Sequence, residues 1–297
     1  MNKKDARGKT CMELQFLERN APFEKAKVCV LPVPYAGTVC FRKGAENGPK
    51  AIMEASLEVE EYDVDLGMET IGGAFPEGFH VMQPVRGGKR KPEEVVADVE
   101  SAIGKVLDTS KFPIALGGEH SISAGAVAAV KKRFPSVSVL QIDAHADLRD
   151  EYQGSKHSHA CAMRRIRDIV PRCAQVGVRS MSAECADYIE KHAKGRVWGA
   201  EFRNEDVLAA LGKEVYITID LDGFDPSEMP GVGTPCPGGI SFRQGISLLK
   251  EVCKRKKVVG FDVVELAPIR GNVVSELFAA NLTYKLAGYS LFAEKLR

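Results

Sequence analysis

The sequence predicts one α/β domain of three layers, in which a mainly parallel sheet lies between helices on both faces. Short apolar runs alternate along the chain with segments whose apolar residues recur at helical spacing, an alternation typical of parallel sheets. The chain has 297 residues, of which 44% are hydrophobic and 27% charged, so it can bury a large core. No repeat, low-complexity segment or long linker divides it, and we therefore expect residues 1–297 to form a single domain.

The predicted strands are apolar runs of the kind buried on both faces of a sheet. They span residues 27–33, 112–116, 137–142, 174–178, 215–219 and 258–264. The predicted helices span residues 92–107, 121–132, 182–192, 241–254 and 273–287. The helix at 92–107 begins with Pro92-Glu-Glu, a favourable start because proline fits the first turn and acidic side chains stabilise the positive end of the helix dipole.

Charge and hydropathy exclude several classes of partner. A net charge of +1 and an isoelectric point near 7.6 offer no basic surface for phosphates, so we expect no nucleic-acid partner. No apolar stretch reaches the ~18 residues of a membrane-spanning helix, and the N-terminus lacks the apolar core of a signal peptide. We therefore expect a cytoplasmic protein with no membrane partner.

The cysteines are scattered and form no Cys-x-x-Cys pair. They occupy positions 11, 29, 40, 161, 173, 185, 236 and 253. We expect reduced thiols, because a chain of this length needs no disulfides to fold. Cys236 is of most interest, since it lies in the glycine-rich segment 231–239, whose sequence is Gly-Val-Gly-Thr-Pro-Cys-Pro-Gly-Gly.

Polar side chains follow directly after four predicted strands. The segments are Gly117-Gly-Glu119-His120-Ser121, Asp143-Ala-His145-Ala-Asp147, Asp220-Leu-Asp222-Gly-Phe-Asp225-Pro226 and, after the run 258–264, Glu265. In parallel sheets ligands bind beyond the carboxyl ends of the strands, so these groups should collect at one edge. Positions 143, 145 and 147 are two apart, as are 220 and 222, so each set projects to one side while the chain stays extended.

This arrangement predicts a site for two divalent cations. An isolated Asp-x-Asp pair is usually a solvated loop, but four carboxylates in one small volume repel each other unless protons or cations intervene. Imidazole and carboxylate ligands without thiolate suit Mn²⁺, Fe²⁺, Co²⁺, Ni²⁺ or Zn²⁺ better than Ca²⁺ or Mg²⁺. The candidate metal ligands are His120, Asp143, His145, Asp147, Asp220 and Asp222.

These motifs, together with Gly37-Thr38, Arg42-Lys-Gly44 and the glycine-rich segment 231–239, resemble those of the arginase/agmatinase family of ureohydrolases. The resemblance covers most of the chain and implies two Mn²⁺ ions per chain. It implies that His120 and Asp147 bind the first ion, that His145 and Asp222 bind the second, and that Asp143 and Asp220 bridge both. Glu119 stands where many relatives have Asp, at a position that we expect to support the ligands rather than bind metal.

The resemblance implies hydrolysis of a guanidinium group to urea and an amine. Two close metal ions lower the pKa of a water molecule enough to supply hydroxide near neutral pH, which can attack the poorly electrophilic guanidinium carbon. By the resemblance His159 carries a proton to the leaving amine, with His157 as the alternative, and Glu265 binds the guanidinium. We also expect Thr234, in the glycine-rich segment, to hydrogen-bond the substrate.

Substrate choice depends on the segment 148–159, Leu-Arg-Asp-Glu-Tyr-Gln-Gly-Ser-Lys-His-Ser-His. Arginases carry neutral Asn, Thr and Ser donors here, whereas Asp150 and Glu151 favour a distal ammonium over a carboxylate, although Arg149 and Lys156 weaken that preference. Agmatine, which yields putrescine for polyamine biosynthesis, is the expected substrate. N1-aminopropylagmatine and guanidinobutyrate are alternatives that the sequence does not separate, and arginine, the substrate of an arginase, is a less favoured one. The resemblance also implies a homo-oligomer.

Two other classes of protein stay open. An amide deacetylase of the same general fold would hold one zinc ion by Asp, His and Asp, and the full set of six candidate ligands argues against it. A non-catalytic binding subunit without metals would need some other defect, because all six ligands are present. Metal content distinguishes these classes from a ureohydrolase.

Overall fold

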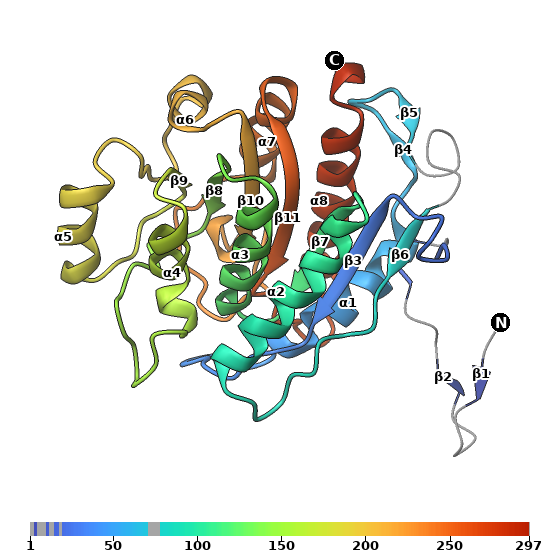
Figure 1. The fold of residues 1–297 in the computed structure, drawn as a ribbon, viewed down its shortest axis with the longest axis horizontal. Coiled ribbons are helices and arrows are strands. Elements are labelled where there is room, and N and C mark those ends of the chain that lie inside the picture. Colours follow the sequence, from blue (N-terminus) through green and yellow to red (C-terminus); the bar gives the residue numbers. More distant parts are fainter. Residues whose placement is uncertain (1–2, 5–9, 12–14, 18–19, 71–77, 297) are drawn as a thin grey trace.

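The central sheet of the described chain has seven parallel strands. Figure 1 shows this sheet with the helices that surround it. The computed structural model describes residues 3–4, 10–11, 15–17, 20–70 and 78–296. Across the sheet the strands stand in the order β6-β3-β7-β11-β10-β8-β9, and each neighbouring pair is parallel. Their bounds are Val28–Val33 (β3), Phe79–Val81 (β6), Phe112–Gly117 (β7), Ser138–Ile142 (β8), Cys173–Val176 (β9), Glu214–Asp220 (β10) and Lys257–Val264 (β11).

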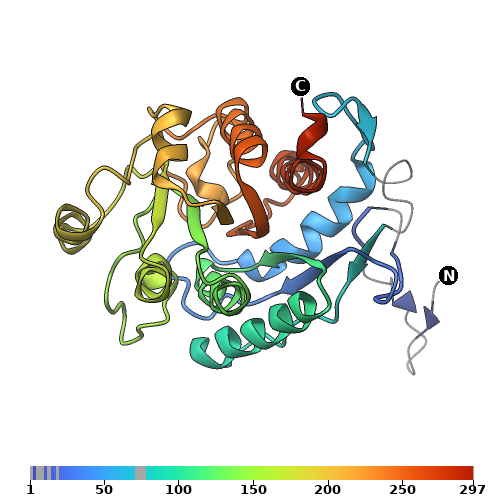
Figure 2. The same cartoon turned by 45° about the horizontal axis from the view of Figure 1, so that its top comes forward.

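Helices cover both faces of this sheet, which Figure 2 shows nearly edge-on. One face packs against α1 (Gly48–Ala55), α6 (Asn204–Ala210), α7 (Phe242–Arg255) and α8 (Val274–Leu291). The other packs against α2 (Pro92–Asp108), α3 (Ser123–Arg133), α4 (Ala162–Ile169) and α5 (Ala183–His192). The predicted three-layer α/β/α architecture is therefore confirmed.

Alternation along the strands divides the core between the two layers. In β10, Val215, Ile217 and Ile219 join the apolar cluster beneath α7 and α8, whereas Tyr216 joins the cluster on the opposite face. Successive side chains of a strand point to opposite faces, so a run that is apolar throughout fits a strand covered on both sides. This is why the apolar runs located six of the seven strands of the sheet.

Except for the end of α8, the predicted elements match the observed ones to within two residues at each end. The segment 121–132 begins as a 3-10 turn, His120–Ile122, before α3, and α8 extends four residues beyond the predicted end at 287. Strand β6 and helices α1, α4 and α6 were missed. All four are short, and α1 begins with Gly48-Pro49, which is as typical of a turn as of a first helical turn.

Some features lie outside the central sheet. Two small antiparallel strand pairs join β1 (Lys3–Lys4) to β2 (Thr10–Cys11), and β4 (Tyr62–Asp63) to β5 (Met68–Glu69). No helix in the described ranges has the length and apolar character needed to cross a bilayer. The cysteine side chains that are described are free thiols, and Cys11 is outside that set.

Candidate metal centre and active site

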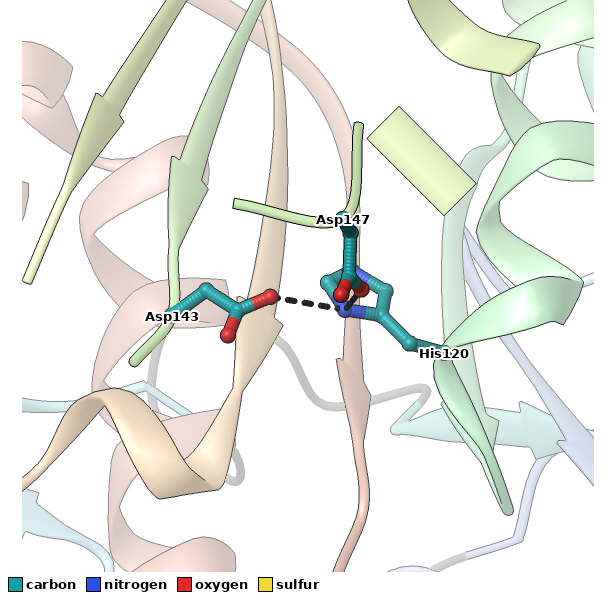
Figure 3. Close-up of side chains that lie close together, drawn as sticks. All are labelled: His120, Asp143 and Asp147. Atoms are coloured by element: carbon teal, nitrogen blue, oxygen red, sulfur yellow. Dashed lines mark ion pairs between the residues drawn. The ribbon is translucent and has the colours of Figure 1, made fainter. Parts of the chain in front are cut away.

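The carboxyl ends of β7, β8 and β10 bring the candidate ligands together. Two groups have ligand atoms within 4.8 Å of one another. They are His120 with Asp143 and Asp147, drawn in Figure 3, and Asp143 with His145 and Asp222. Asp143 belongs to both groups, so the structure places a carboxylate between two potential metal positions.

The distances define how Asp143 is shared. Nδ1 of His120 lies 3.1 Å from Oδ2 of Asp143 and 3.3 Å from Oδ2 of both Asp147 and Asp220. On the other side, Nδ1 of His145 lies 3.6 Å from Oδ1 of Asp143 and 3.0 Å from Oδ2 of Asp222. Each oxygen of Asp143 thus faces a different imidazole. Asp220 lies with the first group, because its Oδ2 contacts Nδ1 of His120.

Hydrogen bonding around His120 tests whether this group fits a cation. The hydroxyl of Thr218 donates to Oδ1 of Asp262 at 2.6 Å, and therefore accepts the N–H of His120 Nε2 at 2.9 Å. The remaining nitrogen, Nδ1, is fully buried and has no hydrogen-bond partner, although three carboxylate oxygens lie within ion-pair distance of it. Burial opposes the charged form of His120, but these carboxylates outweigh it and raise its pKa well above the usual range, so Nδ1 holds a proton when no cation is present. A divalent cation would take the place of that proton, with Nδ1 and the carboxylate oxygens as its ligands.

The electrostatics of the cluster agree with this fit. Burial, and then the neighbouring charges of Asp222 and Asp143, raise the pKa of Asp220 well above its usual range. Burial and the charge of Asp143 raise the pKa of Asp147 to about 6. Burial opposes the charged form of His145, but its contacts with Asp143 and Asp222 outweigh this and raise its pKa to about 12. In the absence of cations the cluster therefore holds protons, which bound metal ions would displace.

One cavity connects this cluster to solvent. His145, Asp147, Asp220 and Asp222 line it together with three further predicted site residues, which are His159, Thr234 and Glu265. His157, the alternative proton carrier, is not part of its lining. Buried His120 and Asp143 do not line the cavity but belong to the ligand cluster at its base. The structure therefore brings nine of the eleven predicted site residues to the ligand cluster or to the cavity.

His159 lies at the end of a hydrogen-bonded chain. Its Nδ1 is 3.1 Å from Oγ1 of Thr38, and the same hydroxyl lies 2.8 Å from Oε1 of buried Glu119. Burial, followed by the positive charges of His120 and His145, lowers the pKa of His159 to about 4. The imidazole is therefore neutral at neutral pH and can accept a proton. The sequence analysis named Gly37-Thr38 among the motifs but assigned no role to Thr38.

Glu265 and Asp147 hold unusual backbone conformations. Their φ angles are 67° and 51°, in the left-handed region that costs a non-glycine residue about 1–3 kcal/mol. Such strain persists where surrounding contacts over-determine the conformation, and one such contact is the 2.7 Å bond from the His120 backbone N–H to Oε1 of Glu265. Burial and the nearby Glu119 raise the pKa of Glu265 well above its usual range.

Of the three residues predicted to bind substrate, one lines the cavity and two do not. Thr234 lines the cavity, and its hydroxyl donates to Oδ2 of Asp222 at 2.9 Å, so it orients a candidate metal ligand. Asp150 and Glu151 do not line the cavity. The Asp150 carboxylate accepts from Arg165 at 2.7 Å, and Glu151 is exposed.

Arg149 occupies the position at the cavity that we expected for the acidic pair. Its guanidinium lies 5.0 Å from the centre of the Tyr152 ring, and both side chains line the cavity. The segment 148–159 therefore presents a cation and an aromatic ring to the cavity. The expected preference for a distal ammonium has no support from Asp150 and Glu151 in this geometry.

Arg179 supports the loop that carries the candidate ligand Asp222, a role that the sequence analysis missed. Its guanidinium donates to the carbonyl oxygens of Asp222 at 2.7 Å, Gly223 at 3.1 Å and Cys236 at 2.6 Å, and so ties the glycine-rich segment 231–239 to the ligand loop. Arg179 follows β9, so the rule that placed the ligands after strands would also have found it. The half-buried Cys236 contributes its carbonyl here and is not part of the cavity lining.

Comparison with known proteins identifies the family. The Arginase family matches residues 26–288. An N(1)-aminopropylagmatine ureohydrolase from Synechocystis sp. is 39% identical over 288 residues, 93% of each chain, and an agmatinase from Pyrococcus horikoshii is 33% identical over 89% of this chain and 92% of its own. The solved agmatine ureohydrolase of Thermoplasma volcanium superposes with a TM-score of 0.83 at 29% identity, covering 96% of both chains. The chain therefore belongs to the arginase family, whose members are hydrolases with a binuclear metal centre.

Proposed function

We propose that this protein hydrolyses the guanidinium group of an agmatine-type substrate to urea and an amine, with N1-aminopropylagmatine and agmatine as the two leading candidate substrates. The observation that carries the proposal is Asp143, whose two oxygens face His120 and His145 at the base of the cavity that His159 and Glu265 line. Membership of the arginase family supports urea release as the reaction.

Two Mn²⁺ ions are the proposed metals. Their ligands are the six residues predicted from the sequence, which are His120, Asp143, His145, Asp147, Asp220 and Asp222. The set has nitrogen and oxygen donors and no thiolate, as first-row divalent metals prefer. When bound, the two ions supply hydroxide at neutral pH and stabilise the charge that develops on the attacked carbon's substituents.

Glu265 is proposed to orient the substrate. One of its oxygens is committed to the backbone N–H of His120, which leaves the other for a guanidinium N–H. A charge-assisted bond from a planar cation to this carboxylate would hold the guanidinium carbon over the metal cluster. The raised pKa of Glu265 falls when a cation binds beside it. Binding of the cationic substrate and ionisation of the Glu265 carboxyl group therefore favour each other.

His159 is proposed to move the proton that the leaving amine needs. Addition of hydroxide to the guanidinium carbon leaves an O–H proton, and cleavage of the carbon–nitrogen bond requires a proton on the departing nitrogen. A neutral imidazole on the cavity wall can accept the first proton and donate it to that nitrogen, so protons balance over the reaction. Thr38 fixes the orientation of this ring through Nδ1.

The choice between the two substrates follows from the relatives. The relative that acts on N1-aminopropylagmatine is 39% identical to this chain, and the agmatinase is 33% identical, so we place N1-aminopropylagmatine first. This reverses the order expected from the segment 148–159 alone. Guanidinobutyrate is the third candidate, because the cation of Arg149 lines the cavity and would attract a distal carboxylate.

One assay tests both reaction and substrate. Urea release should be measured from N1-aminopropylagmatine, agmatine, guanidinobutyrate and arginine at a single manganese concentration, with metal content determined on the same preparation. About two ions per chain with urea release from the first two substrates supports the proposal. A chain that binds no metal would point instead to a binding subunit, and amide hydrolysis with one zinc ion would point to a deacetylase.

We also propose that the chain is a single domain that acts in the cytoplasm as a homo-oligomer, without nucleic-acid or membrane partners. The coverage of 93% of the Synechocystis relative supports the single domain, and the net charge of +1 argues against a nucleic-acid partner. Light scattering of the purified protein tests the oligomer, and fractionation of cells tests the location.

A further inference from the structure

We propose that Arg167, Gln175 and Gln141 form a one-way hydrogen-bond relay that fixes the orientation of Asp143 and thereby sets the affinity of the metal centre. The inference rests on the proposed metal site, because Asp143 is the residue that both ligand groups share. The three residues touch neither the cavity nor any other candidate ligand group, so they are positioning residues rather than catalytic ones.

The relay runs across two neighbouring strands to a helix. Nε2 of Gln141 in β8 lies 2.5 Å from Oδ2 of Asp143. Nε2 of Gln175 in β9, the residue paired with Gln141 across the parallel strands, lies 2.5 Å from Oε1 of Gln141. Nη2 and Nε of Arg167 in α4 lie 3.1 and 3.3 Å from Oε1 of Gln175.

The direction of every bond in this relay is determined by its ends. Arginine can only donate, so the oxygen of Gln175 must face it and the amide N–H groups of Gln175 must point the other way. The carbonyl of Ala146, which can only accept, lies 3.0 Å from the same Nε2 and fixes this orientation independently. Gln141 therefore presents its oxygen to Gln175 and its N–H to Asp143, where a carboxylate can only accept.

Burial makes this order energetically important. Gln141, Gln175 and Asp143 are fully buried, and Arg167 is 5% exposed. Among the described residues no carboxylate lies within ion-pair distance of Arg167, and the relay connects its guanidinium to the carboxylate of Asp143 through two amides. Bonds in a buried chain between opposite charges polarise one another, and a reversed amide would leave two acceptors facing each other out of reach of water.

The relay helps to fix the plane of the Asp143 carboxylate at the metal centre. Oδ2 of Asp143 is held by Gln141 on the side of His120, and Oδ1 accepts the backbone N–H of His145 at 2.5 Å on the other side. With both oxygens anchored, each faces its own imidazole before any ion binds. Preorganisation of this kind lowers the cost of metal binding, and residues behind metal ligands typically contribute about 10- to 100-fold in affinity.

The test compares variants that keep or break the direction of the relay. Gln175→Glu retains, as an ion pair, the contact with Arg167 but cannot donate, so Gln141 must reverse and turn its oxygen toward Asp143. Arg167→Lys keeps a donor at the start of the relay. Thr283→Val removes a buried hydrogen bond, from Thr283 to Ala279, in α8 far along the chain and serves as a control for lost stability alone. Metal-free proteins are titrated with Mn²⁺ by calorimetry, and their melting temperatures are recorded.

We expect Gln175→Glu to bind Mn²⁺ about 10- to 100-fold more weakly than the unchanged protein, with Arg167→Lys and Thr283→Val within about three-fold of it. Equal affinity of Gln175→Glu and the unchanged protein would overturn the relay, as would an equal loss in Thr283→Val. If Gln175→Glu does not fold, Gln141→Met is measured in its place. This variant removes the donor to Asp143 while Gln175 keeps its hydrogen bond to the carbonyl of Ala146. An unchanged Mn²⁺ affinity of Gln141→Met would overturn the relay. An unchanged protein with no Mn²⁺ affinity would overturn the proposed function itself.

Discussion

Asp143 and His120 face each other at the base of the cavity, with Oδ2 of the carboxylate 3.1 Å from Nδ1 of the imidazole, while the second oxygen of the same carboxylate faces His145. Because one side chain serves both ligand groups, Asp143→Ala should abolish binding of both metal ions. His120→Ala should remove one ion preferentially. Metal analysis after dialysis against Mn²⁺ checks the stoichiometry, with the exposed His192→Ala as a control that keeps both ions. Two ions per chain in Asp143→Ala would refute the shared role.

His159→Asn should keep its metal content and lose about 10²- to 10⁴-fold in turnover, the usual contribution of a general acid or base. The matched control is His157→Asn, because His157 lies two residues away and does not line the cavity. Steady-state kinetics with both variants separate the two histidines. The assignment would move to His157 if the two variants showed the opposite pattern.

Thr38→Val should lower turnover about ten-fold, because it removes the hydroxyl that connects His159 to buried Glu119 and leaves the ring free to reorient. Thr38→Ser keeps the hydroxyl and should restore most of the activity. The Michaelis constant should change little in either variant, since Thr38 contacts the proton carrier rather than the substrate. A serine variant as impaired as the valine variant would show that the methyl group, and not the hydroxyl, matters.

Arg149→Gln should raise kcat/KM for agmatine and N1-aminopropylagmatine and lower it for guanidinobutyrate, because a cation at the cavity repels an ammonium and attracts a carboxylate. The expected change is modest, about five-fold or less, since the site is open to water. The double exchange Asp150→Asn with Glu151→Ser is the comparison. A larger loss of agmatine discrimination in that variant would return the specificity to the acidic pair.

Asp65 should stabilise the fold in a pH-dependent manner. Burial alone would raise its pKa, but bonds from Lys250 at 2.8 Å, Tyr289 at 2.5 Å and Lys285 at 3.1 Å outweigh burial and lower it. A lowered folded-state pKa means that this contribution is present above the unfolded pKa, near 4, and declines as pH falls toward the folded one.

Asp65→Asn should therefore lower the free energy of unfolding by about 1–3 kcal/mol at neutral pH, with a difference from the unchanged protein that shrinks below about pH 4. Urea unfolding of the metal-free proteins from pH 7 down to about pH 3 measures this difference. A difference in free energy that stays constant over that whole range would show that the stabilisation does not depend on the ionised carboxylate of Asp65.

The sequence by itself determined six of the seven strands of the sheet, the layers and the set of candidate ligands. Buried parallel strands are continuous apolar runs, and the motifs around His120, Asp143 and Asp220 stand directly after such runs, so local pattern and topology were sufficient to predict their convergence. The short elements β6, α1, α4 and α6 escaped prediction because a few residues show no clear periodicity.

Only the tertiary structure decided which side chains face the cavity and what holds them. Asp150 turns to Arg165 while its neighbour Arg149 lines the cavity, a choice that depends on loop backbone angles and on a partner 15 residues away. Thr38 meets His159 across 121 residues, and Gln141 meets Gln175 across 34. Hydrogen-bond direction and the left-handed backbone of Glu265 come from contacts distant in sequence, and local sequence carries no information about which distant partner a polar side chain will find.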